Sequence, residues 1–338
     1  MKNRYSIQIN LVRGKSYQFS YNYGATKNVT LRVGRNFAEI RVRLSSLFSS
    51  EDILSSNSYL FPDAIRKVLL LQMVLFSNSM NIRKIKITVN SKSETINYSA
   101  DHHAPVYQLI SGQFQRSVPD TWKQGTVIDY ILSNPKSSFD MRTAALFSYI
   151  LSKSKKYESE RFVNLWMAFN GMYGFLSSLV PKAKGNRSEK DQIALLMQTY
   201  GLGKEGIDSK DNNSIGQEVS KILRHTDVAD FITHPLKNNI PADFAENIRN
   251  CLNKSQSIGA YDISVYGYLL AQFSYYFRCN IIHADKPLNL ISYKDDHNLN
   301  CLRIINGLLE EFLDEHLTDI FDNAKVQKLI EGVEINGK

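Results

Sequence analysis

The sequence predicts an α+β domain, made mostly of antiparallel strands with one helix, followed by an all-α helical domain. Apolar residues in the first hundred positions alternate with polar ones, which is the two-residue period of strands. After position 139 they recur at helical spacing instead, and residues 111–138 show neither period and contain several Gly and Pro. We therefore expect a basic α+β domain at 1–115, a linker at 116–138 and a helical domain at 139–338.

Five strands and one helix are expected in the first domain. Each strand places its apolar or aromatic residues on one face and its polar residues on the other. The helix begins at Pro62-Asp63, because Pro is tolerated in a first helical turn and Asp suits the positive end of the helix dipole, and it runs to about Ser77. The expected strands are 5–12, 17–23, 29–33, 38–44 and 84–89.

Cationic side chains share the outer face of two of these strands. If the apolar residues face inward, Arg41, Arg43, Lys84 and Lys86 point outward. The first 100 residues contain 15 Lys and Arg against 5 Asp and Glu, within a chain of net charge +8. We predict that these four residues bind RNA; a solvated basic face is the alternative. The many tyrosines of this domain could stack on bases, although alternating tyrosines are also common in sheet cores.

Seven helices are expected in the second domain, because apolar residues recur there at three- and four-residue intervals. No strand pattern is visible in this part of the sequence. The expected helices are 139–154, 158–180, 188–200, 216–231, 241–253, 261–284 and 298–323.

The last turns of the expected helix 261–284 carry Arg278 and His283. Histidine exchanges a proton near neutral pH, and arginine stays charged and can bind two phosphate oxygens. Five residues of an ideal helix turn through about 500°, so the two side chains point about 140° apart. A single helix is thus a poor site, whereas two copies meeting across a two-fold axis would line one cleft with both residues, so a homodimer is expected.

Two segments resemble the HEPN superfamily. Residues 165–173, LWMAFNGMY, are similar to the LWxAFNxLY helix of one bacterial branch, and residues 278–283, RCNIIH, are similar to its RCNxxH motif. The resemblance covers roughly residues 139–325. Active members of the superfamily are metal-independent ribonucleases that act as dimers. The resemblance therefore implies a HEPN-like helical domain with endoribonuclease activity, in a toxin–antitoxin or anti-phage setting with RNA, and an antitoxin or other defence protein, as partners.

The chemistry expected of such a site is attack of the RNA 2′-hydroxyl on the adjacent phosphorus, which leaves a 2′,3′-cyclic phosphate. His283 would move the proton and Arg278 would stabilise the charge of the transition state. Asn280, three residues before His283, would orient the ring or hold a phosphate. Asn170 and Cys279 are secondary candidates, because many relatives carry polar or acidic residues at those motif positions.

A non-catalytic HEPN module that binds RNA, a nucleotide or a protein partner is the alternative. Arg278 would then be a cation at the end of a helix, and His283 a buried histidine with satisfied hydrogen bonds. A metal site is not predicted, because neither His102-His103 nor the group His225, Asp227, Asp230 and His234 has ligand spacing.

The remaining composition favours a cytoplasmic protein. Three cysteines, Cys251, Cys279 and Cys301, are few and odd in number, which is typical of reduced thiols. No signal peptide is expected, and no apolar run is long enough for a membrane span. Phosphate-binding and serine-hydrolase motifs are absent, and no cofactor is predicted.

Overall fold

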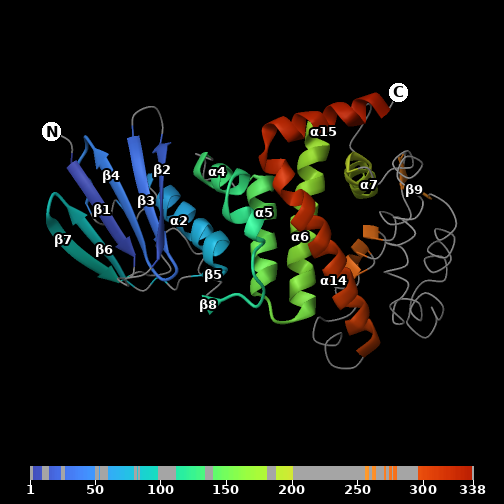
Figure 1. The fold of residues 1–338 in the computed structure, drawn as a ribbon, viewed down its shortest axis with the longest axis horizontal. Coiled ribbons are helices and arrows are strands. Elements are labelled where there is room, and N and C mark those ends of the chain that lie inside the picture. Colours follow the sequence, from blue (N-terminus) through green and yellow to red (C-terminus); the bar gives the residue numbers. More distant parts are fainter. Residues whose placement is uncertain are drawn as a thin grey trace. The chain divides into compact units, whose positions relative to one another are not determined.

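The computed structural model divides into two compact units, Met1–Phe139 and Asp140–Lys338. The first unit contains a six-stranded antiparallel sheet with helices and the second is mostly helical, so the predicted fold class is confirmed (Figure 1). The structure describes residues 3–9, 15–23, 27–49, 53, 60–79, 82, 84–97, 112–133, 140–180, 188–200, 256–258, 261–263, 270–271, 274–275, 277–279 and 296–336.

The sheet has the strand order β2-β3-β4-β1-β6-β7, and every neighbouring pair is antiparallel. The five predicted strands are all present. The sixth, β7, was missed because it is a mostly polar edge strand, joined to β6 through Asn90 and Ser91, whose positive φ angles of 46° and 80° suit a tight hairpin. The strands are β1 (Asn3–Ile9), β2 (Ser16–Tyr23), β3 (Lys27–Gly34), β4 (Ala38–Leu44), β6 (Lys84–Val89) and β7 (Lys92–Asn97).

One face of the sheet is buried against helix α2 (Leu60–Phe76), which contacts β3 and β4. Ile7, Leu31, Ile40 and Ile85 are fully buried on this face, because alternate residues of each strand point to the same side. Burial of these side chains against α2 is the main favourable contribution to the stability of this unit.

A buried polar cluster ties α2 to β2. The Asp63 carboxylate accepts hydrogen bonds from Arg66 and Lys67 on α2, at 2.6 and 2.8 Å, and from the Tyr21 hydroxyl of β2 at 3.3 Å. Burial lowers the pKa of Lys67, although Asp63 opposes that shift. Hydrogen bonds of this kind compensate for removing charged groups from water, and their geometry fixes how α2 lies on the sheet.

The segment expected to be a linker, 116–138, is part of the first unit. It contains the 3₁₀-helix η1 (Asp120–Lys123) and helix α4 (Thr126–Ser133), and both contact α2. Trp122 and Val127 are buried at 0% and 1% exposure. The Gly and Pro residues around these short helices obscured the spacing of the apolar residues that pack against α2. The division between the two units falls at 139/140.

The second unit is built around α6, which contacts α5, α7 and α14 (Figure 1). A Cβ atom at Gly171 of α6 would lie 2.8 Å from the Cβ of Ala145 in α5, so the glycine permits a close approach of these two helices. The helices are α5 (Met141–Ser154), α6 (Glu158–Leu179), α7 (Glu189–Thr199), α14 (Asp296–His316) and α15 (Asn323–Asn336), with the 3₁₀-helix η2 (Leu317–Phe321) between the last two.

Two expectations for the helical unit are corrected. Residues 261–263 form strand β10, which pairs with strand β9 at 256–258, so the helix expected from 261 does not begin there. Tyr261 and Ile263 stand two residues apart, but a three-residue strand is too short to reveal its period in the sequence. The last expected helix, 298–323, is instead α14 followed by η2. The helices expected at 216–231 and 241–253 lie outside the described residues.

None of the helices in the described part of the chain combines the length and the apolar character needed to cross a membrane.

Charged side chains join α5, α6 and α14 inside the unit. Lys153 of α5 and Arg161 of α6, which are 3% and 5% exposed, both donate to the carboxylate of Glu310 on α14. Asp314 lies 3.5 Å from the Lys153 amine, and Glu158 lies 3.0 Å from Arg161. Glu310 therefore compensates two buried cations on two different helices.

We predict that Glu310→Ala lowers the free energy of unfolding by about 3 to 5 kcal/mol, because it leaves buried cations without their shared carboxylate. Glu311→Ala is the matched control, since Glu311 is exposed on the same helix. It should change stability by about 0.5 kcal/mol or less. Urea unfolding followed by circular dichroism measures both, and equal effects of the two substitutions would contradict the role of Glu310.

Candidate functional site

Helix α6 carries an aromatic stripe along one side. Phe162, Trp166, Phe169 and Tyr173 recur at helical spacing and are at most 2% exposed. Neighbouring rings are in contact, with centroids 5.6 Å apart for Trp166 and Phe169 and 5.5 Å apart for Phe169 and Tyr173. This stripe contains the aromatic residues of the LWxAFNxLY-like motif, and it is buried as an interior surface of the unit.

The helical residues 270–271, 274–275 and 277–279, here called the Arg278 segment, pack against this stripe. The Phe277 ring meets Phe162 edge-on with centroids 6.1 Å apart, and the Tyr275 ring meets Trp166 at 6.5 Å. Phe277 is only 3% exposed. The residues directly before the RCNIIH-like motif therefore pack against the helix that carries the LWxAFNxLY-like motif, although the two are far apart in the sequence.

Arg278 lies at the edge of this packed region beside Glu189 and Tyr173. One guanidinium nitrogen is 3.6 Å from Glu189 Oε2, and the Tyr173 hydroxyl donates to Glu189 Oε1 at 2.8 Å. Glu189 stands in the first turn of α7, directly after Ser188, which forms a capping box with Asp191. One carboxylate thus connects α6, α7 and the Arg278 segment, while the Arg278 side chain stays 21% exposed.

The electrostatics of the cluster keep Arg278 charged and the tyrosines protonated. Burial opposes the charged form of Arg278, but Cys279 and Glu189 outweigh it and raise the pKa of the guanidinium. Burial and the hydrogen bond to Glu189 raise the pKa of the Tyr173 hydroxyl above its ordinary value. Burial also raises the pKa of Tyr275, whose ring lies 5.6 Å from the guanidinium carbon of Arg278. The cluster therefore offers one permanent cation and neutral phenol groups near it.

The structure places only some of the predicted site residues. Cys279 is half-buried, and its sulfur lies 4.0 Å from a guanidinium nitrogen of Arg278. Asn170 is exposed on α6, and none of the contacts found among the described residues joins it to Arg278. Asn280 and His283 lie outside the described residues, as do the histidine groups at 102–103 and 225–234.

Sequence reasoning missed Glu189 and the role of the Tyr173 hydroxyl. Glu189 appeared in the sequence only as part of a helix start, and nothing in its spacing pointed to Arg278. Its role depends on how α7 packs beside α6, which is a tertiary contact. The Tyr173 ring is buried, and the hydroxyl at its tip donates to Glu189. A buried tyrosine hydroxyl usually has a hydrogen-bond partner, and this was the one available signal.

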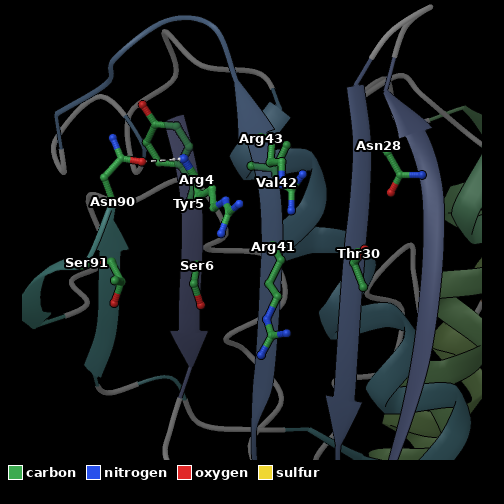
Figure 2. A pocket seen from close by; sticks show the side chains of 11 residues that line it. Arg4, Tyr5, Ser6, Asn28, Thr30, Arg41, Val42, Arg43, Asn90 and Ser91 are labelled. Carbon is green, nitrogen blue, oxygen red and sulfur yellow. Dashed lines mark hydrogen bonds between the residues drawn. The ribbon is translucent and has the colours of Figure 1, made fainter. Parts of the chain in front are cut away.

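The four cations predicted on the sheet all point away from α2. Arg41, Arg43 and Lys84 are exposed and Lys86 is half-buried, while the alternate residues of β4 and β6 face the core. Arg41 and Arg43 line an open hollow of about 730 Å³ on this outer face (Figure 2). Arg4 of β1 lines the same hollow and was not predicted, because the sequence does not show which residue of β1 lies beside β4.

The tyrosines of the sheet do not form a base-stacking platform on this face. Tyr5 and Tyr21 are buried, at 2% and 8% exposure, and point toward α2. Tyr17 is 38% exposed but belongs to the same side, where its ring contacts Phe76 of α2. Of the two readings of the alternating tyrosines, the structure therefore supports core packing.

Comparison with protein-family models, with curated proteins and with solved structures finds no match to this chain. The packing of the Arg278 segment on α6 and the charge of the sheet face are therefore the observations that bear on function.

We predict that neighbouring residues of the Arg278 segment differ sharply in their contribution to stability. Phe277→Ala removes a buried ring that packs on Phe162 and should lower the free energy of unfolding by about 3 to 5 kcal/mol. Arg278→Ala removes a partly exposed ion pair and should cost about 1 kcal/mol or less. Chemical denaturation of both variants measures the difference. A loss for Arg278→Ala as large as that for Phe277→Ala would make Arg278 a structural residue.

Proposed function

We propose that this chain is a HEPN-like, metal-independent endoribonuclease in which Arg278 and His283 perform the chemistry. The observation that supports it is the position of Arg278: Phe277 and Tyr275, directly before the motif, contact the aromatic stripe of α6, and Arg278 emerges at its edge. The resemblance implies a toxin–antitoxin or anti-phage setting, and the few, odd-numbered cysteines favour the cytoplasm.

In the proposed reaction the ribose 2′-oxygen bonds to the adjacent phosphorus while the bond from phosphorus to the 5′-oxygen breaks. A base accepts the 2′-hydroxyl proton and an acid protonates the departing 5′-oxygen, so the products are a 2′,3′-cyclic phosphate and a 5′-hydroxyl. Histidine suits both proton transfers near neutral pH, and His283 from each of two subunits would supply one. Asn280 would orient the ring or hold the phosphate.

Arg278 suits the remaining task, which is to stabilise negative charge on the phosphate oxygens as it grows. Its guanidinium carries a permanent charge and a planar set of donors. At 3.6 Å the pair with Glu189 is longer than a good hydrogen bond, so a phosphate that accepts two short hydrogen bonds would be a stronger partner. Cys279 and Asn170 are proposed only as neighbours of this centre.

A non-catalytic HEPN module is the second candidate, and one contact favours it. Glu189 already compensates the charge of Arg278 within the chain, so the cation has a structural partner without any ligand. In that case the Arg278 segment would serve as part of a scaffold that binds RNA, a nucleotide or a protein. The two candidates differ in whether removal of the cation destroys an activity or only weakens the packing.

We predict that the purified protein cuts RNA in excess EDTA and leaves 2′,3′-cyclic phosphate ends. Arg278→Ala and His283→Ala should each reduce the rate by about 10²-fold or more, because each removes a group that acts in the transition state. Arg303→Ala, an exposed arginine on α14, is the matched control and should cut at the wild-type rate. Gel analysis of end-labelled RNA and mass spectrometry of the ends measure the outcome.

Three results would reject the nuclease. The first is a wild-type rate of cutting by Arg278→Ala or His283→Ala. The second is cutting that occurs only with added Mg²⁺ or Mn²⁺, and the third is products that end in a 5′-phosphate. If the wild type does not cut while RNA still binds, the non-catalytic module is favoured.

We also predict a homodimer through the 261–283 region, because Arg278 and His283 would point about 140° apart on one helix, which makes a single copy a poor site. Light scattering over a range of concentrations measures the mass. A protein that stays monomeric at the highest concentration, yet cuts RNA, would refute the shared site.

A further inference from the structure

The outer face of the sheet is polar throughout and strongly basic. Apart from Gly34, the outward residues of its six described strands are all polar or charged. They include four Arg and two Lys against one carboxylate, Glu39. A face without an apolar side chain lacks the apolar core on which a stable protein interface is usually built, so its chemistry points to a charged, hydrated ligand.

Glu39 leaves most of this positive charge uncompensated. It accepts hydrogen bonds from Ser6 at 3.0 Å and Gln8 at 3.4 Å, and it pairs with Arg41 at 2.9 Å. Its side chain is 9% exposed, whereas that of Arg41 is 64% exposed. The carboxylate is therefore already occupied by its neighbours, and Arg41 can still extend toward a ligand.

Two arginines lie directly opposite each other on neighbouring strands. In the register of β1 and β4, Arg4 faces Arg43, and the structure shows no ion pair for either one among the described residues. Like charges placed opposite each other destabilise a sheet, so folding alone gives no reason for this pair. A bound anion would relieve the repulsion and make the arrangement favourable.

Arg4, Arg41 and Arg43 line the open hollow of about 730 Å³ together with hydroxyl and amide groups and with the inward residues Tyr5 and Val42, and no carboxylate lines it. Figure 2 shows their side chains on the same face as Ser6, Thr30 and Asn28. Arg41 and Arg43 are two residues apart on one strand, about 7 Å, and Arg4 is about 5 Å across from Arg43. These are Cα spacings; with Arg32, Lys84 and Lys86 the cations extend over four neighbouring strands, β3, β4, β1 and β6, which is wider than one phosphate.

We infer that this face binds the phosphate backbone of single-stranded RNA, with Arg4, Arg41 and Arg43 as its centre. Arginine, serine, threonine and asparagine side chains are the usual partners of phosphate and sugar oxygens. The described strands place no aromatic ring on this face, so bases are not stacked there and the contact is independent of sequence. Lys84 and Lys86 extend the same charge across β6.

The identity of the polyanion as RNA rests on the proposed nuclease function, whereas the site itself rests on the face alone. Holding a substrate strand on one unit raises its effective concentration at a site elsewhere in the same chain. The first unit would then act as a substrate anchor, which increases the rate at low RNA concentration without taking part in bond breaking.

Binding is measured on the full chain carrying His283→Ala, so that RNA stays intact, using fluorescence anisotropy of a labelled 20-nucleotide poly(U). The triple change Arg4→Ala, Arg41→Ala and Arg43→Ala should weaken binding at least tenfold. It should also reduce the slope of log K against log salt concentration by about 2, since each lost phosphate contact on a single strand removes about 0.7.

The control has the same loss of charge on other surfaces: Lys15→Ala, Lys92→Ala and Lys123→Ala, all in the first unit and none among the outward residues of the sheet face. It should bind nearly as well as the parent. Melting of both triple variants shows whether they fold, and both should unfold cooperatively, because relief of the Arg4–Arg43 repulsion offsets the loss of the Arg41 partner of Glu39.

Equal weakening by both triple variants, or no binding of poly(U) by the parent, would overturn the inference. So would displacement of the RNA by poly-glutamate at the same charge concentration, which would assign the face to an acidic protein. RNA cleavage by the wild type is scored separately. If the chain binds RNA through this face but the wild type does not cut it, the RNA-binding face is supported and the nuclease is rejected. If the wild type cuts RNA but the arginine variant binds it as well as the parent, the nuclease is supported and the RNA-binding face is rejected.

Discussion

The aromatic stripe of α6 is the contact on which the helical unit depends. It is the surface against which segments from distant parts of the sequence are buried: Phe277 packs on Phe162, Tyr275 on Trp166, and Phe312 of α14 on Phe169. Aromatic side chains bury 150 to 250 Å² each, so a stripe of this kind supplies much of the free energy that holds these segments together. The position of Arg278 is a consequence of that burial, because Phe277 beside it is fixed in the core.

Helical geometry then explains why Arg278 is available for chemistry. Successive residues of a helix point about 100° apart, so a segment that buries Phe277 turns its next side chain toward the rim of the core. There Arg278 meets Glu189 at 3.6 Å, close enough for attraction and too long for a strong hydrogen bond. The carboxylate is held by Tyr173, so it orients the cation while leaving part of it exposed. The Arg278–Glu189 contact supports the folded state. A phosphate that takes the place of Glu189 must interact with Arg278 more strongly than this carboxylate does.

The elements predicted correctly from the sequence are those long enough to show a repeating pattern of apolar residues. Five strands of the sheet, the inward and outward residues of β4 and β6, and helices α5, α6 and α7 follow their apolar spacing. The polar edge strand β7 and the three-residue strands β9 and β10 carry too little pattern, and α4 is short and flanked by Gly and Pro. Arg278 was identified from its motif, but its pairing with Glu189 and the register that sets Arg4 opposite Arg43 are tertiary facts without a local signal.

In a strand, alternate residues face the core and the solvent, so the fold constrains the inward residues much more than the outward ones. In β1 and β4 the core is specified by Ile7, Ile40 and their inward neighbours, so the outward positions could hold any polar residue without loss of the fold. Opposed arginines are a poor choice at such positions, because they repel each other across the strands. Where packing does not dictate a residue and electrostatics disfavours it, its presence is best explained by a ligand. The same reasoning applies with less force to Arg278, whose charge already has a partner in Glu189. The charge pattern of the sheet face is therefore the stronger physical argument for anion binding. The proposal of a cleavage reaction rests instead on the residues around Arg278.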